Sequence, residues 1–170
     1  MENLVILVDE NDIPIGQGEK QEVHRNGQLH RALSIFIYNG RNEMLLQRRA
    51  KDKYHSGGLW TNACCTHPAP GEETASAADR RLRQEMGIHC LLFHSFSFIY
   101  KVELSNQMTE HEFDHVFVGK TEMIPKPDPS EVMEWKYLGQ KEITAQIKTN
   151  PGDFTEWFKL ILPQLKIMGL

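Results

Sequence analysis

Short strand-like runs separated by turn residues are the feature of this sequence that most limits its fold. Two such runs, Leu33–Tyr38 and Glu43–Gln47, flank Asn39-Gly40, a dipeptide that strongly favours a β-hairpin. Further runs with the composition of strands are Leu4–Asp9, Trp60–Thr66, Phe96–Leu104, Phe113–Gly119 and Met133–Leu138. A chain with this many strand signals has to build its core around a sheet.

Helical patterns are fewer than strand patterns. Thr74–Met86 has apolar residues along one face, and Gly87 follows as a stop signal. The last third predicts a short helix near Lys141–Lys148 and a longer one from Phe154, which Pro163 should bend or break. Because strands outnumber helices and do not alternate regularly with them, the sequence predicts an α+β fold with a mixed sheet.

Size and composition indicate one ordinary globular domain. The chain has 170 residues, of which 40% are hydrophobic and 25% charged, so we expect a single domain over residues 1–170. A net charge of −4 gives no electrostatic reason to expect nucleic-acid binding. No apolar run approaches the roughly 20 residues of a membrane span. We therefore expect neither nucleic acid nor membrane as a partner.

Cysteine usage indicates a reducing compartment. Three cysteines, two of them adjacent, do not make a disulfide framework. The first apolar run, residues 4–8, is too short for a signal peptide and follows an acidic residue. A cytoplasmic location is the expectation.

The segment Trp-Thr-Asn-Ala-Cys-Cys-Thr-His-Pro, residues 60–68, contains side chains suited to proton transfer and metal binding. In a strand, alternation places Cys65 and His67 on one face and points Cys64 to the other. A register slip of one residue would exchange the two cysteines. Taken alone, Cys65 could be an inert buried side chain, because cysteine packs as a small hydrophobe, and we favour that interpretation for Cys64.

Glu110-His111-Glu112 is a second such segment. In a strand the two glutamates share a face and His111 points to the other. Upstream, His24 and His30 could complete a metal shell with these carboxylates, although each alone is better explained as a surface histidine. The combination suggests metal-dependent proton chemistry, with a cysteine and a glutamate on opposite sides of one substrate.

The segment 71–88 resembles a degraded Nudix box, the loop and helix that hold magnesium against a diphosphate. Thr66 stands where the family has its leading glycine, Arg81 and Gln84 replace two helix glutamates, and only Glu85 remains of the acidic cluster. Hydrolysis needs several carboxylates to hold metal and activate water. The resemblance therefore implies a Nudix-like mixed sheet flanked by helices, and diphosphate binding without hydrolysis. The matching residues are Glu72, Arg80, Leu82, Glu85, Gly87 and Ile88.

The two polar segments make the resemblance narrower. Trp-Thr-Asn-x-x-Cys-x-His-Pro at 60–68, Glu-x-Glu at 110–112 and the histidines at 24 and 30 resemble type I isopentenyl diphosphate isomerases. The likeness runs over nearly the whole chain. It implies an isomerase that interconverts isopentenyl and dimethylallyl diphosphate by metal-dependent, antarafacial proton addition and removal. A small-molecule substrate and a monomer or weak dimer are the corresponding expectations.

The resemblance also implies two metal sites. A divalent ion such as Zn²⁺ or Mn²⁺ suits three imidazoles and two carboxylates. A Mg²⁺ ion would bridge to the substrate diphosphate, held by Glu85 and the backbone carbonyl of Cys65. The implied ligands of the first ion are His24, His30, His67, Glu110 and Glu112.

Catalytic roles follow from the same resemblance. Cys65 and Glu112 would act on opposite faces of the substrate, and Tyr100 would relay or orient the glutamate's proton, although a tyrosine that only fills the core is equally compatible. Protonation of the alkene leads to a tertiary carbocation-like state, which an aromatic face stabilises by roughly 1–2 kcal/mol. Trp157 matches the family residue proposed for this, and Trp60 could form another wall; either could instead be core.

Cationic side chains are expected to bind the diphosphate, because arginine forks and compact lysine charges suit phosphate oxygens. The run at 48–53 would otherwise be an ordinary solvated charge run, and the resemblance selects Arg49 and Lys53 from it. Lys51–Gly58 is predicted to be a mobile loop, and the segment near 20–30 to close over the substrate and exclude water. The four candidates are Lys20, Arg49, Lys53 and Arg81.

Two other functions fit less well. A Nudix hydrolase of a nucleoside diphosphate derivative would need the helix carboxylates that this chain lacks. A metal-dependent binding or regulatory module would leave Cys65 without a task.

Overall fold

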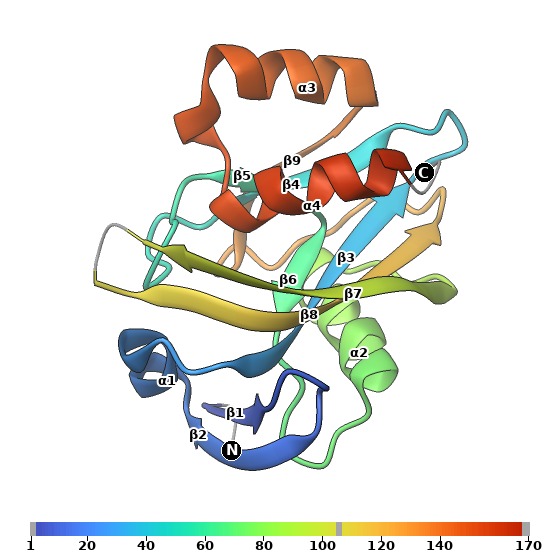
Figure 1. Ribbon diagram of the computed structural model, residues 1–170. Coiled ribbons are helices and arrows are strands. Elements are labelled where there is room, and N and C mark those ends of the chain that lie inside the picture. Colours follow the sequence, from blue (N-terminus) through green and yellow to red (C-terminus); the bar gives the residue numbers. More distant parts are fainter. Residues whose placement is uncertain (1–2, 105–106, 168–170) are drawn as a thin grey trace.

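The computed structural model describes residues 3–104 and 107–167. Within these residues, nine strands form one mixed sheet with helices on both faces (Figure 1), which confirms the predicted α+β class. The strands are β1 (Leu4–Val8), β2 (Pro14–Glu19), β3 (His30–Tyr38), β4 (Met44–Arg49), β5 (Trp60–Thr61), β6 (Cys64–Thr66), β7 (Leu92–Glu103), β8 (Thr109–Lys120) and β9 (Val132–Leu138). The helices are α1 (Lys20–Asn26), α2 (Thr74–Met86), α3 (Gln140–Thr149), a 3₁₀ turn at Pro151–Asp153 and α4 (Glu156–Ile167).

Strand β3 is the centre of the sheet. Along one edge it pairs in parallel with β8, from His30 opposite Glu112 to Tyr38 opposite Lys120. Along its other edge it meets β1, β6 and β4 in turn, all antiparallel. Strand β7 extends the sheet beyond β8, and β9 pairs with β4. The polar segments at 60–68 and 110–112 thus reach the two sides of one strand.

Two layers of buried apolar side chains, one on each face, stabilise the sheet. Ile35 and Ile37 of β3 pack in the layer beneath α2, whereas Phe36 packs in the layer beneath α4. A strand that is covered on both faces needs apolar residues on both, which explains its near-continuous hydrophobic sequence. Each fully buried side chain of this size contributes about 1.5–3 kcal/mol. These layers make β3 a rigid support for the polar residue at its start, His30.

The segment at residues 60–66 is not the single strand that its composition predicts. It forms β5 and β6, with a break at Asn62-Ala63. The Asn62 side-chain amide donates to the carbonyl oxygens of Ile35 at 3.0 Å and Cys64 at 2.9 Å. A side chain that satisfies backbone groups in this way replaces the regular ladder locally.

Helix α4 continues through Pro163, so of the predicted bend or break the break does not occur. Proline costs a helix roughly 3 kcal/mol. Phe158, Ile161 and Leu165 of this helix are fully buried against the sheet, and this packing outweighs the local cost. Among the described residues, no helix is long and apolar enough to cross a membrane.

Candidate active site

The register of three strands aligns three polar residues in one row. His30 of β3 lies opposite Glu112 of β8, and Glu112 lies opposite Tyr100 of β7. Residues that are opposite one another across a sheet point to the same face. The Tyr100 hydroxyl donates a hydrogen bond to Glu112 Oε2 at 2.7 Å. The row therefore joins an imidazole, a carboxylate and a phenol.

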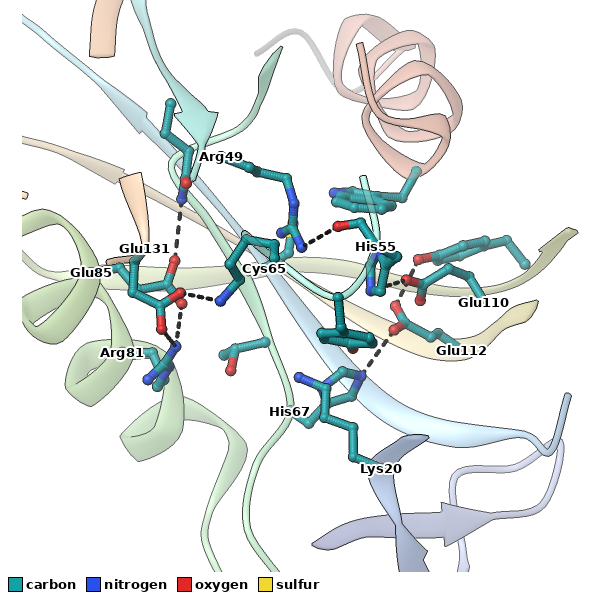
Figure 2. Close-up of a pocket in the computed structure, with 16 residues that line it drawn as sticks. Lys20, Arg49, His55, Cys65, His67, Arg81, Glu85, Glu110, Glu112 and Glu131 are labelled. Carbon is teal, nitrogen blue, oxygen red and sulfur yellow. Dashed lines mark hydrogen bonds and ion pairs between the residues drawn. The ribbon is translucent and has the colours of Figure 1, made fainter. Parts of the chain in front are cut away.

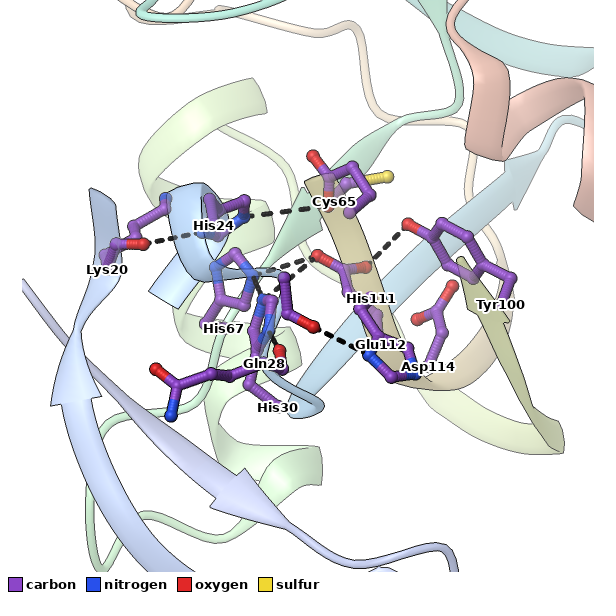
Figure 3. Close-up of polar contacts among 12 residues, drawn as sticks. Lys20, His24, Gln28, His30, Cys65, His67, Tyr100, His111, Glu112 and Asp114 are labelled. Carbon is purple, nitrogen blue, oxygen red and sulfur yellow. Dashed lines mark hydrogen bonds and ion pairs between the residues drawn. The ribbon is translucent and has the colours of Figure 1, made fainter. Parts of the chain in front are cut away.

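Two further histidines complete a polar cluster (Figure 3). His67 lies one residue beyond β6, with its Nε2 atom 3.0 Å from Glu112 Oε1 and 3.1 Å from His30 Nε2. His24 comes from α1. One ligand atom from each of His24, His30, His67 and Glu112 lies within 4.8 Å of all the others.

Backbone carbonyls orient two of these imidazoles. His24 Nδ1 lies 2.6 Å from the Lys20 carbonyl oxygen, and His30 Nδ1 lies 2.9 Å from that of Gln28. A nitrogen that donates to a carbonyl leaves the opposite nitrogen, Nε2, with its lone pair facing the cluster. His24 Nε2 is buried and has no hydrogen-bond partner among the described residues. This donor set and its outer hydrogen bonds fit a divalent cation.

Glu110 lies beside this cluster and forms an adjoining group with His24 and His55. Its Oε2 atom is 3.6 Å from His24 Nε2, and its Oε1 atom is 3.2 Å from His55 Nε2. Burial lowers the pKa of His55 to about 3, so this imidazole is neutral at physiological pH. His55 was not predicted from the sequence, because a single histidine in a polar loop has no periodicity or spacing that distinguishes it.

Cys65 reaches the site from the other edge of β3, opposite Ser34. Its Sγ atom donates to Asn62 Oδ1 at 3.0 Å and lies 3.4 Å from Ser34 Oγ. Burial raises the pKa of Cys65, so the side chain is a protonated thiol at neutral pH. Cys64 is fully buried in the layer beneath α2, on the opposite face, as alternation predicts.

Asp114 is a further residue of the site that was not predicted from the sequence. Its Oδ2 atom accepts a hydrogen bond from Ser34 Oγ at 2.8 Å, and Oδ1 has no partner among the described residues. Complete burial, together with the charge of Glu112, raises the pKa of Asp114 well above its usual value. The signal was present in the sequence, because Asp114 continues the alternation of Glu110 and Glu112 by one more step.

The cluster opens into a pocket with a cationic wall (Figure 2). Arg81 pairs with Glu85 at 2.6 Å, and Arg49 Nη2 donates to the His55 carbonyl oxygen at 3.2 Å. Lys53 forms an ion pair with Glu131. All four cations selected from the sequence line this pocket, together with Glu85 and Cys65: Lys20, Arg49, Lys53 and Arg81.

Comparisons with known proteins identify the family. A NUDIX domain model matches residues 28–158. The chain is 50% identical to the isopentenyl-diphosphate Delta-isomerase of Pectobacterium atrosepticum, over 95% of this chain and 90% of that protein. It is 46% identical to isopentenyl-diphosphate Delta-isomerase 2 of Aromatoleum aromaticum, over 97% of this chain and 87% of that protein. The chain belongs to the isopentenyl-diphosphate Delta-isomerase family.

Solved structures of other proteins share the fold of this family member. A Deinococcus radiodurans protein superposes with a TM-score of 0.76 at 19% identity, over 93% of this chain and 96% of that one. The MutT protein of Methanosarcina mazei superposes with a TM-score of 0.69 at 17% identity, over 83% of this chain and 95% of that one. These likenesses confirm the Nudix fold that the degraded box predicts.

The two tryptophans predicted as possible aromatic walls of the site differ in their position relative to the pocket. Trp157 of α4 lines the pocket, with the Arg49 guanidinium 5.3 Å from its ring centroid. Trp60 is not among the lining residues, and Lys136 Nζ lies 4.0 Å from its ring centroid instead. Trp60 packs against the apolar layer beneath α4, which fits the core alternative, and its role as a second wall stays a prediction.

Proposed function

We propose that this protein is an isomerase that interconverts isopentenyl diphosphate and dimethylallyl diphosphate in a metal-dependent reaction. One observation carries the proposal: Cys65 and Glu112 line the same pocket from β6 and β8, which flank opposite edges of β3. A reaction that adds a proton at one allylic carbon and removes one from another needs two such groups. The names of the relatives support the same substrate.

The ionisation states of the two groups suit this task. Burial keeps the proton on the Cys65 thiol. For Glu112, burial opposes the charge, but hydrogen bonds from its neighbours, led by His30, outweigh burial and lower its pKa. One group thus begins protonated and the other ionised. Proton donation to the terminal alkene carbon leaves positive charge at C3, and removal of a C2 proton then forms the new double bond.

The buried Trp157 ring supports such a charge-separated state. It is 2% exposed and forms part of the pocket lining. An aromatic face attracts a nearby cation most strongly where water is excluded. Exclusion of water also protects a carbocation from capture by hydroxide or water.

Two divalent ions complete the proposal. The first, Zn²⁺ or Mn²⁺, would be held by the three histidines of the cluster with Glu112 and Glu110, and would supply positive charge that orients and polarises the glutamate side. The second, Mg²⁺, would be held by Glu85 and the Cys65 carbonyl beside the cationic wall, where it would neutralise diphosphate charge. The cationic side chains would anchor the diphosphate without reacting with it.

A Nudix hydrolase is the alternative, and the structure of the α2 helix disfavours it. Arg81 occupies a position where a hydrolase needs a carboxylate, and it pairs with the remaining one, Glu85. Gln84 accepts hydrogen bonds from Arg80 and Arg81 instead of holding metal. A non-catalytic binding module would give the Cys65 thiol no role. Three free cysteines are typical of a reducing compartment, so we propose a cytoplasmic location for the protein, as a single domain.

NMR of isopentenyl diphosphate with the purified protein and Mg²⁺ in D₂O tests the proposal. We expect dimethylallyl diphosphate with incorporated deuterium, lost after chelation and reduced by several orders of magnitude in Cys65→Ala. Cys64→Ala, on the other face of the sheet, is the matched control and should retain the rate. Unlabelled, unchanged substrate from folded, metal-loaded protein would refute the isomerase, and phosphate release from nucleotide substrates would favour the hydrolase.

A further inference from the structure

Glu110 lies between two imidazoles that face different oxygens of its carboxylate. Its Oε1 atom is 3.2 Å from His55 Nε2, whereas its Oε2 atom is 3.6 Å from His24 Nε2. All three side chains are buried, with residue exposures of 3% for Glu110, 8% for His55 and 0% for His24. His55 Nε2 thus lies within hydrogen-bond distance of one carboxylate oxygen, whereas His24 Nε2 faces the other oxygen from slightly beyond that distance. His55 is not among the ligands that the family resemblance implies.

The hydrogen bonds around His55 indicate which nitrogen carries its proton. His55 Nδ1 lies 3.2 Å from Ser56 Oγ, and a hydroxyl can donate to an imidazole nitrogen. The tautomer that satisfies both contacts accepts at Nδ1 from Ser56 and donates from Nε2 to Glu110. A nitrogen that carries a proton has no lone pair for a metal, so this arrangement disfavours His55 as a ligand.

We propose that His55 is a positioning residue that holds Glu110 by Oε1 and thereby presents Oε2 to the metal cluster. The inference rests on the metal site of the proposed function. Carboxylates that bind metals are commonly fixed by an outer hydrogen bond, and loss of such a partner typically weakens metal affinity by roughly 10- to 100-fold. His55 supplies that partner from a loop rather than from the sheet.

The position of His55 also connects the metal side of the pocket with the diphosphate side (Figure 2). Its carbonyl oxygen accepts from Arg49 Nη2 at 3.2 Å, and its ring meets Trp157 edge to face at 5.7 Å. The same loop carries Lys53, which lines the pocket. A contact that fixes the loop to Glu110 therefore helps to set the position of two cations that would bind the diphosphate.

Two amide variants separate the hydrogen bond from the loss of the ring. The glutamine nitrogen of His55→Gln reaches about as far as Nε2 and can still donate to Glu110, whereas that of His55→Asn reaches only about as far as Nδ1. Mn²⁺ alone is titrated into each metal-free protein, and the free ion is measured by electron paramagnetic resonance. We expect roughly 10- to 100-fold weaker binding in His55→Asn and about threefold or less in His55→Gln. His89→Asn, at an exposed histidine, is the control.

Two results would overturn the inference. Wild-type affinity in His55→Asn would mean that the contact does not position Glu110. Pulsed electron paramagnetic resonance of bound Mn²⁺ counts the histidine nitrogens coupled to the ion. Loss of one nitrogen in His55→Asn would show that His55 is a metal ligand. An unchanged count with weaker binding supports positioning, and rescue in His55→Gln excludes a mere loss of folding. Because these measurements use no substrate, a wild-type protein that binds Mn²⁺ but converts no isopentenyl diphosphate would refute the isomerase while leaving this test valid.

Discussion

Replacement of Tyr100 by phenylalanine separates the two interpretations of this tyrosine, as an acid–base partner or as core filling. Tyr100 is 8% exposed, and its ring stacks on Phe98 with centroids 5.5 Å apart. Phenylalanine keeps this ring contact and removes one group, the hydroxyl that donates to Glu112 Oε2 at 2.7 Å. The change therefore tests the hydrogen bond and leaves the packing intact.

The expected size of the effect follows from the charge of the acceptor. A hydrogen bond to a charged group contributes about 1.5–3 kcal/mol. Each 1.36 kcal/mol of lost transition-state stabilisation lowers a rate about tenfold, so kcat/KM should fall roughly 10- to 150-fold in Tyr100→Phe. Core filling alone predicts no change in rate, because the ring remains.

Tyr38 provides the matched control. It is also a strand tyrosine, burial raises its pKa to about 12, and its hydroxyl has no hydrogen-bond partner among the described residues. Loss of an unpaired hydroxyl costs little, so Tyr38→Phe should retain both rate and stability. The assay is isomerisation followed by NMR at fixed, saturating metal, with urea unfolding of each variant. Equal rates for Tyr100→Phe and wild type would refute a role of the hydroxyl in proton transfer.

Two further predictions concern the fold and its closure. Gly87 adopts a left-handed φ of 65° after α2, and a Cβ there would clash with the Lys126 carbonyl oxygen, so Gly87→Ala should lower the free energy of unfolding by at least about 1–2 kcal/mol. Gly152→Ala, where a Cβ would meet nothing within 4 Å, is the control in the same urea titration, and equal losses would argue against this explanation. If the segment near residues 20–30 closes on the substrate, metal and isopentenyl diphosphate together should slow its cleavage by proteases; unchanged cleavage would count against closure.

The fold could be predicted from the sequence where one local signal decided the outcome. The period and stop of the Thr74–Met86 helix gave its bounds, because side-chain periodicity and a left-handed glycine act within a few residues. The break at Asn62 could not be predicted, because it depends on a hydrogen bond to Ile35, which is 27 residues away in the chain. Pro163 shows the same limit, since buried contacts with the sheet override the local preference.

The site was predictable where its residues follow a strand period and not where they lie in a loop. Alternation put Glu110 and Glu112 on one face, and the next step, Asp114, joins Cys65 through Ser34. His55 could not be found, because its inward position is accompanied by contacts with Glu110 and Trp157, which are distant in sequence. For Trp60 the sequence leaves wall and core open, because the contact of its ring with Lys136 of β9 depends on strand packing.

The division of the pocket explains how a hydrolase fold could host an isomerase. The α2 helix and the loop after β4 contribute charge to one wall, where Arg81 and Glu85 pair. The other wall consists of strand residues whose spacing is set by the register of β3 and β8, and it carries Glu112, one of the two groups that we propose for proton transfer. A Nudix hydrolase concentrates its carboxylates on the helix, where they activate water against the diphosphate. On the proposed function, replacement of those carboxylates by Arg81 and Gln84 leaves a helix that binds a diphosphate without breaking it. The reaction class can therefore change through a few helix positions while the sheet, and with it the fold, remains the same.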